Sequence, residues 1–156
     1  MISNSTPLIC LAKIGRIDVL RKVFGKVVIP RQVLEEVLTE GKEGSREINE
    51  CVEEGWIEVA RVRSKKDYGV DKGENAVINL ALELKDEVLI DDAKAIRVLR
   101  VLGLNYFRIT SLVLLALKKG VLEKGEAKEI IYDLVSNGYW LSSSFLARII
   151  GAIEKF

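Results

Sequence analysis

Short runs of β-branched and aliphatic residues alternate along the chain with longer segments in which apolar residues recur at helical spacing. Strands are expected over residues 1–3, 26–29, 56–62, 87–90 and 106–109. Helices are expected over residues 17–24, 33–38, 46–54, 73–84, 93–102, 126–136 and 143–154, with one more opening at Thr6–Pro7 and one running from a cap at Thr110 or Ser111 to Gly120. This alternation predicts a parallel sheet with helices on both faces.

The pattern contains no linker and no internal repeat, so we expect one α/β domain over residues 1–156. Its predicted architecture is a three-layer α/β/α sandwich with a parallel sheet. The helices at about residues 126–156 carry apolar faces and are expected to dock on this domain. Hydrophobic residues make up 49% of the 156, which is far too many for a disordered chain.

Net charge and hydropathy limit the partners and the cellular compartment that we expect for the protein. The net charge is +1, so a strong non-specific attraction to nucleic acid is not expected, and any such contact requires a local patch. The longest apolar run, from Leu112 to Leu117, is far short of the ~20 residues that span a bilayer. With no signal-peptide pattern at the start, we expect a cytoplasmic protein without membrane contact, whose Cys10 and Cys51 stay reduced in the core.

Several kinds of chemistry are excluded by what the sequence lacks. There is no histidine, which removes Ser-His-Asp and Cys-His catalysis and every His-ligated metal site. Neither a G-x-G-x-x-G nor a G-x-x-x-x-G-K-[ST] motif occurs, so a dinucleotide or P-loop nucleotide site is not expected. Carboxylate chemistry remains.

Polar and acidic residues follow several of the predicted strands. In open parallel sheets, ligands bind beyond the carboxyl ends of the strands, so these residues are expected to meet at one edge. The segments concerned are Ser3–Thr6, Glu35–Glu36, Gly73–Glu74 and Asp91–Asp92. Converging carboxylates repel one another, and a divalent cation stabilises them together.

These segments resemble the motifs of the PIN-domain family, in particular its prokaryotic toxin-like members. The resemblance lies in ISNSTPLI from Ile2, VIPRQVLEEV from Val28, KGENA from Lys72 and LIDDAKA from Leu89. It extends over nearly the whole chain, and the motifs occur in the family's order. It implies an endonuclease that acts on RNA with Mg²⁺ or Mn²⁺.

Carried over onto matching positions, the resemblance assigns an acidic cluster. The implied metal ligands are Asn4, Glu36, Glu74, Asp91 and Asp92, and the four acids among them are the implied catalytic residues. The supporting side chains are Ser5, Thr6 and Thr110. Asn4 stands where the family has Asp, which keeps an oxygen ligand but removes a negative charge, so weaker metal binding is expected.

Each of these residues also has a purely structural interpretation. Glu74 lies in the first turn of a helix, where a negative charge interacts favourably with the helix dipole. Asp92 is placed to cap a helix, and Asn4 is placed to form a turn. Glu36 fits a solvated helix face. These alternatives remain open at the level of the sequence.

RNA contacts are expected from two basic segments. The candidates are Arg61, Arg63, Lys65 and Lys66 in and after an edge strand, and Lys94 and Arg97 on the helix after Asp92. Such residues bind phosphates, but charged residues also protect an edge strand or form a solvated helix face. Tyr139 and Trp140 have the chemistry to stack on a base, although packing in the core is the preferred interpretation.

The sequence therefore predicts a PIN-type, Mg²⁺- or Mn²⁺-dependent endoribonuclease, the toxin of a toxin–antitoxin pair, weakened by Asn4. The expected partners are an RNA substrate, an antitoxin protein and a second copy of the chain in a homodimer. The alternative is a catalytically degenerate PIN domain that serves as an RNA-binding or protein-interaction module.

Overall fold

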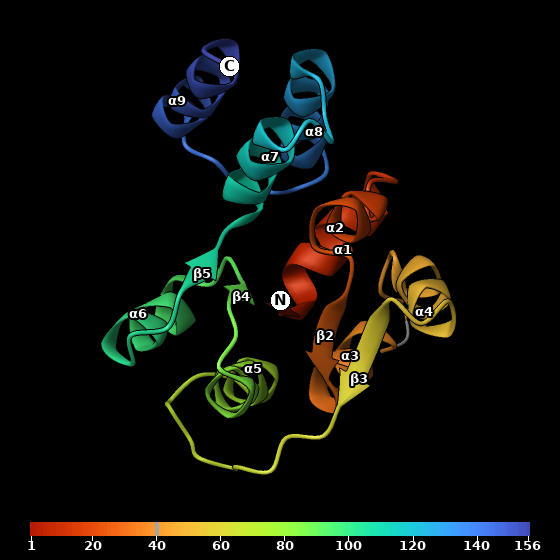
Figure 1. Cartoon of the computed structure of the whole chain (residues 1–156), viewed down its shortest axis with the longest axis vertical. Helices are drawn as coiled ribbons and strands as arrows, with labels where there is room; N and C mark the ends of the chain where they lie inside the picture. The colour runs from red at the N-terminus through yellow and green to blue at the C-terminus, as the bar shows by residue number, and fades with distance from the viewer. Residues whose placement is uncertain (40) are drawn as a thin grey trace.

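The computed structural model describes residues 1–39 and 41–156 and contains a central sheet flanked by helices (Figure 1). Its strands are β1 (Ile2–Ser3), β2 (Val27–Pro30), β3 (Ile57–Ala60), β4 (Val88–Leu89) and β5 (Tyr106–Phe107). They lie in the order β3-β2-β1-β4-β5, and every described pair of neighbours is parallel. The predicted parallel sheet is confirmed, although its strands are shorter than the apolar runs in the sequence.

Helices cover both faces of this sheet, which confirms the predicted three-layer α/β/α arrangement. The helices that the structure describes are α1 (Ser5–Lys13), α2 (Asp18–Phe24), α3 (Arg31–Val37), α4 (Ser45–Glu53), α5 (Lys72–Leu84), α6 (Ala93–Val101), α7 (Ile109–Lys118), α8 (Lys124–Ser136) and α9 (Ser143–Glu154). In Figure 1, α5 and α6 lie on one side of the strands, and α1, α2 and α7 lie on the other. α5 packs directly against β1 and β2.

The hydrophobic core forms because helices cover both faces of the sheet. Strand residues such as Ile2, Ile29 and Leu89 are fully buried, because helices exclude water from both faces of a parallel sheet. On α5, Val77 and Ile78 are buried as well, and they join the same apolar cluster as the strands. Burial of this kind fixes α5, and with it the acidic residue in its first turn, against the middle of the sheet.

The order of the strands also creates a topological switch point between β1 and β4. From β1 the chain crosses to β2 and β3 on one side, and it returns across the sheet to β4 and β5 on the other. β1 and β4 are neighbours, and their following helices α1 and α6 leave toward opposite faces (Figure 1). Ligands in open α/β folds bind at such a switch point, beyond the carboxyl ends of the strands.

The start of α7 differs from the prediction, which placed its cap at Thr110 or Ser111. The helix begins at Ile109, and Arg108 occupies the N-cap position without a side-chain capping bond. Instead, the Asp91 carboxylate accepts a hydrogen bond of 3.2 Å from the Ile109 backbone N–H. A side chain from the neighbouring strand end therefore satisfies a free helix N–H, which a rule based on local sequence does not anticipate.

The C-terminal helices pack against α7. Both α8 and α9 contact it, and apolar residues such as Ile131 and Ile153 are fully buried in the main core cluster. Between these helices, Tyr139 is half-buried, but Trp140 is 82% exposed. The expectation that Trp140 packs in the core is therefore wrong. No helix in the described part of the chain has both the length and the apolar character needed to cross a membrane.

Candidate functional site

Asn4 is held at the carboxyl end of β1 with an unsatisfied side chain. Its backbone N–H donates to the Leu89 carbonyl at 3.0 Å, which fixes it beside the end of β4. The side chain is only 5% exposed, and its Oδ1 atom has no hydrogen-bond partner among the described residues. Buried polar atoms are normally paired, so this oxygen indicates that a water or a cation belongs beside it.

Glu74 is the second buried polar group at this edge. It lies in the first turn of α5, which packs against β1, and it is 8% exposed. Burial, followed by the neighbouring carboxyl groups of Asp71 and Asp92, raises the pKa of Glu74 to about 9. Without a cation, Glu74 therefore holds a proton at neutral pH and can donate it to a neighbouring carboxylate.

Both neighbours of Glu74 are helix caps. The Asp71 side chain accepts from the Glu74 backbone N–H at 2.9 Å, and it caps α5. The Asp92 side chain accepts from the Ala95 backbone N–H at 2.8 Å, and it caps α6. The capping interpretation of Asp92 is thus correct, and it is compatible with a ligand role, because the same carboxyl group also lies within hydrogen-bonding reach of Glu74.

Glu36 reaches this region from α3 because residue 73 is a glycine. A side chain on Gly73 would place its Cβ 2.7 Å from Oε2 of Glu36 and 3.7 Å from Oδ1 of Asp71. The Glu36 carboxylate therefore lies directly over the first turn of α5. A cavity at this position is lined by residues of α3 and of the start of α5, among them Gln32, Glu36, Asp71 and Gly73.

Asp91 points toward the C-terminal part of the chain. Its Oδ1 accepts a 2.5 Å hydrogen bond from the Tyr139 hydroxyl, and its Oδ2 accepts from Ile109 N–H. Burial raises the pKa of Asp91, while the Tyr139 hydroxyl, the Ile109 N–H and the charge of Arg108 act in the opposite direction. With both oxygens engaged in this way, Asp91 has the contacts of a structural carboxylate, whereas Asp92 faces Glu74.

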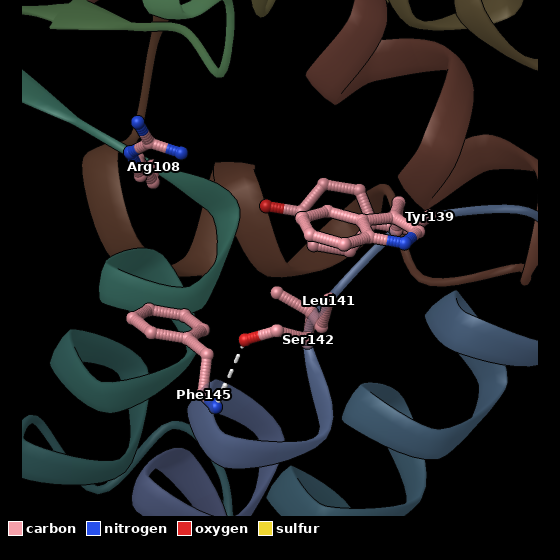
Figure 2. Close-up of a pocket in the computed structure, with 6 residues that line it drawn as sticks. Arg108, Tyr139, Leu141, Ser142 and Phe145 are labelled. Carbon is pink, nitrogen blue, oxygen red and sulfur yellow. Dashed lines mark hydrogen bonds between the residues drawn. The ribbon is translucent and has the colours of Figure 1, made fainter.

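A second hollow is lined by Tyr139, the residue whose hydroxyl group donates to Asp91 (Figure 2). In Figure 2, Arg108, at the start of α7, and the rings of Tyr139 and Phe145 surround a common space. The cavity has a volume of about 410 Å³, and its remaining lining comes from Trp140, Leu141 and Ser142. Arg108 was not predicted as a functional residue, because no local pattern indicates that β5 brings it next to the loop after α8.

The basic residues predicted to contact RNA are all accessible to solvent. All six are exposed: Arg61, Arg63, Lys65, Lys66, Lys94 and Arg97. Of these, Lys65 and Lys66 line a further cavity that Lys72, Gln32 and Asn79 also border, next to the Glu36 region. Side-chain oxygens of Gln32 and Asn79 are buried there without a partner among the described residues.

The supporting hydroxyl groups lie around the same edge. Ser5 and Thr110 are buried in the first turns of α1 and α7, and Thr6 is exposed. Sequence reasoning missed Asp71, although its position three residues before Glu74 is the spacing of a helix cap and could have revealed it.

The carboxyl end of the sheet offers few oxygen ligands for a divalent cation. In the part of the chain that the structure describes, no group of three acidic or cysteine side chains is close enough to hold a metal. The oxygens at this edge are those of the neighbouring Glu74 and Asp92 carboxyl groups and, at the end of β1, which packs against α5, the partnerless amide oxygen of Asn4. Mg²⁺ binds through one or two carboxylates and fills its remaining positions with water and phosphate, so this donor set fits it.

The comparisons with known proteins agree with this architecture. The family model described as a PIN domain matches residues 1–155. No curated protein and no solved structure matches the chain. The family has a nuclease-type fold, and its members generally use divalent metals. Because the match covers nearly all of the sequence, the chain belongs to the PIN-domain family.

Proposed function

We propose that this protein is a metal-dependent endoribonuclease whose centre is formed by Asn4, Glu74 and Asp92, with Glu36 beside them. The observation that carries the proposal is the buried Oδ1 of Asn4, which lacks a partner at the edge where α5 brings Glu74. A folded protein tolerates such an oxygen next to close carboxyl groups most readily when a cation satisfies all of them.

The exposure of each residue indicates its role at the proposed metal centre. Asn4 and Glu74, both buried, would fix the position of the cation, and the exposed Asp92 would complete its ligands at the entrance. Mg²⁺ or Mn²⁺, once bound, supplies charge neutralisation at the scissile phosphate and lowers the pKa of a bound water. Glu36 is half-buried and borders an open cavity, so it is placed to orient the attacking water.

Cleavage of a labelled single-stranded RNA with Mn²⁺, Mg²⁺ or EDTA tests this proposal. Asp92→Asn should abolish cleavage and leave the fold intact, because Asn caps a helix about as well as Asp does. Asn4→Asp should increase the rate, because it restores a negative ligand at a position of the same shape. Glu129→Gln on α8 is the matched control, since it removes an exposed carboxylate far along the chain from the site.

Two results would contradict the proposal. One is cleavage that persists in EDTA. The other is cleavage that survives Asp92→Asn at the rate of the Glu129→Gln control. A gain from Asn4→Asp together with a loss from Asp92→Asn would identify a nuclease of reduced metal affinity.

The second candidate function is a PIN domain that binds RNA without cutting it. Asn4 favours this candidate, because the natural side chain supplies one negative charge fewer than the Asp that the family has at this position. It predicts that RNA binds with equal affinity in Mg²⁺ and EDTA, and that neither the wild-type protein nor Asn4→Asp cleaves it.

We also propose a cellular location, a toxin role and an oligomeric state. We place the protein in the cytoplasm, as a toxin that a small antitoxin neutralises and as a homodimer. Exposed apolar side chains on the C-terminal helices, Tyr132 and Val135 among them, support a protein contact there. Growth arrest on expression, relieved by Asp92→Asn, tests the toxin role, and sedimentation tests the dimer.

A further inference from the structure

The hollow between β5 and α9 combines a cation with aromatic rings. Its lining includes Arg108, Tyr139, Trp140 and Phe145. Tyr139 is held in place, because its hydroxyl group donates to Asp91. The tethered Tyr139 therefore forms a fixed wall of this hollow, and Figure 2 shows Phe145 and Arg108 around the same space.

Two groups in this hollow are accessible to a ligand, although the charge of Arg108 also acts on the nearby Asp91. Arginine ion pairs in the described part of the chain involve Arg16, Arg21 and Arg46, and Arg108 takes part in none of them. Trp140 exposes 82% of its surface, so its indole ring contributes little to the core. An unpaired guanidinium beside an exposed indole complements a ligand that carries both an anion and a flat ring.

This hollow is connected to the proposed nuclease centre through one peptide unit. Tyr139 binds Asp91, and the next residue, Asp92, is the carboxylate that faces Glu74. Asp91 and Asp92 are consecutive in the chain, so the loop after β4 carries one contact to the hollow and one to the proposed centre.

We propose that the hollow lined by Arg108 and Trp140 binds one nucleotide of a single-stranded RNA, with its base stacked on Trp140 and its phosphate on Arg108. The inference rests on the proposed function, because it assigns a subsite to the same substrate. Single strands are preferred over duplexes, because only an unstacked base presents its face to the indole. A protein segment is the competing occupant, but a nucleotide matches the lining more fully, because it carries a phosphate for the guanidinium and a flat base for the indole together.

Binding measured in EDTA separates this subsite from catalysis. A short fluorescein-labelled oligouridylate is titrated with the full chain, and its anisotropy is recorded at several salt concentrations. Trp140→Ala should weaken binding about 10-fold, in line with the loss of one stacked base. Arg108→Gln should weaken binding several-fold and reduce the slope of log affinity against log salt by about 0.7, the value for one phosphate contact on a single strand.

Matched controls remove a similar side chain from elsewhere in the C-terminal part of the chain. Phe156→Ala deletes an exposed aromatic ring just after α9, and Arg148→Gln deletes an exposed arginine on α9. Both should bind the oligouridylate like the wild type. Intrinsic fluorescence gives a second readout, because the only other tryptophan, Trp56, is 5% exposed. The RNA should quench emission in the wild type but not in Trp140→Phe.

The outcomes are distinct for the two proposals. If pocket variants lose RNA affinity and no variant cleaves RNA, the subsite stands and the nuclease proposal fails. If the wild type cleaves RNA, and Trp140→Ala and Arg108→Gln bind and cleave equally well, the subsite is wrong and the nuclease stands. Emission from Trp140 that responds to no RNA also overturns the inference and leaves a protein as the occupant.

Discussion

Replacing Glu74 by Gln tests the electrostatics of the site without any assay of activity. In the folded protein without metal, burial and the adjacent carboxyl groups of Asp71 and Asp92 raise the pKa of Glu74 from 4.5 to about 9. The side chain is then protonated in the folded state and ionised in the unfolded state at neutral pH. Stability linked to this group is complete at low pH and is lost as the pH rises toward 9.

The size of the stability change follows from the unfolded and folded pKa values of Glu74. Each pH unit between the unfolded and folded pKa lowers the free energy of unfolding by about 1.4 kcal/mol. From pH 4.5 to pH 7, the loss amounts to about 3 kcal/mol, and it approaches about 6 kcal/mol near pH 9. Gln has the shape of the protonated acid and does not titrate, so Glu74→Gln should match the wild type at about pH 4 and exceed its stability by about 3 kcal/mol at pH 7.

Urea unfolding in EDTA, followed by circular dichroism between about pH 4 and pH 9, measures this difference. Glu129→Gln, an exposed site on α8, controls for the loss of a carboxylate as such. Mg²⁺ at a hundred times its Kd should add about 2.7 kcal/mol to the wild type at pH 8 and much less to Glu74→Gln. Parallel stability curves for the wild type and Glu74→Gln across this pH range would refute the reasoning.

Three further changes test other contacts of the structure. Gly73→Ala should displace the Glu36 carboxylate and lower RNA cleavage, yet leave the urea midpoint unchanged or higher, because Ala favours a helix by about 0.5–1 kcal/mol. Tyr139→Phe should destabilise the protein by about 1.5–3 kcal/mol at neutral pH by removing the hydrogen bond to ionised Asp91, and by less in acid, as urea unfolding at both pH values would show. Ile78→Ala, in the buried face of α5, should cost about 2–5 kcal/mol in the same measurement, with no change in the pH dependence.

Hydrophobic periodicity was sufficient to predict the order of the elements. The predicted helix over residues 143–154 coincides with α9, and the segment over residues 73–84 differs from α5 by one residue at its start. Strand lengths were overestimated, as at residues 56–62, where only Ile57–Ala60 pairs with β2. An apolar pattern indicates which residues are buried. The length of a strand depends on where the neighbouring strand stops pairing with it, and one segment of sequence does not show where that is.

The site could be predicted only in part, for a related reason. Motif spacing placed Glu74 and Asp92 at one edge, and the structure places their carboxyl groups next to each other. The same spacing did not distinguish Asp91 from Asp92, because the difference depends on Tyr139, which is distant in sequence. The prediction that Trp140 is packed was wrong, because its hydrophobic side chain favours burial but no neighbouring element covers it.

The two hydrogen bonds to Asp91 have a practical consequence for anyone who handles this chain. Both partners lie beyond residue 107, so the C-terminal third of the protein holds the loop that carries Asp92. A truncation before residue 139, or a bulky tag that displaces α9, would leave the half-buried Asp91 carboxylate without its hydroxyl donor. Such a protein would retain every motif residue and still lose the alignment of the loop that carries Asp92, so purification tags belong elsewhere.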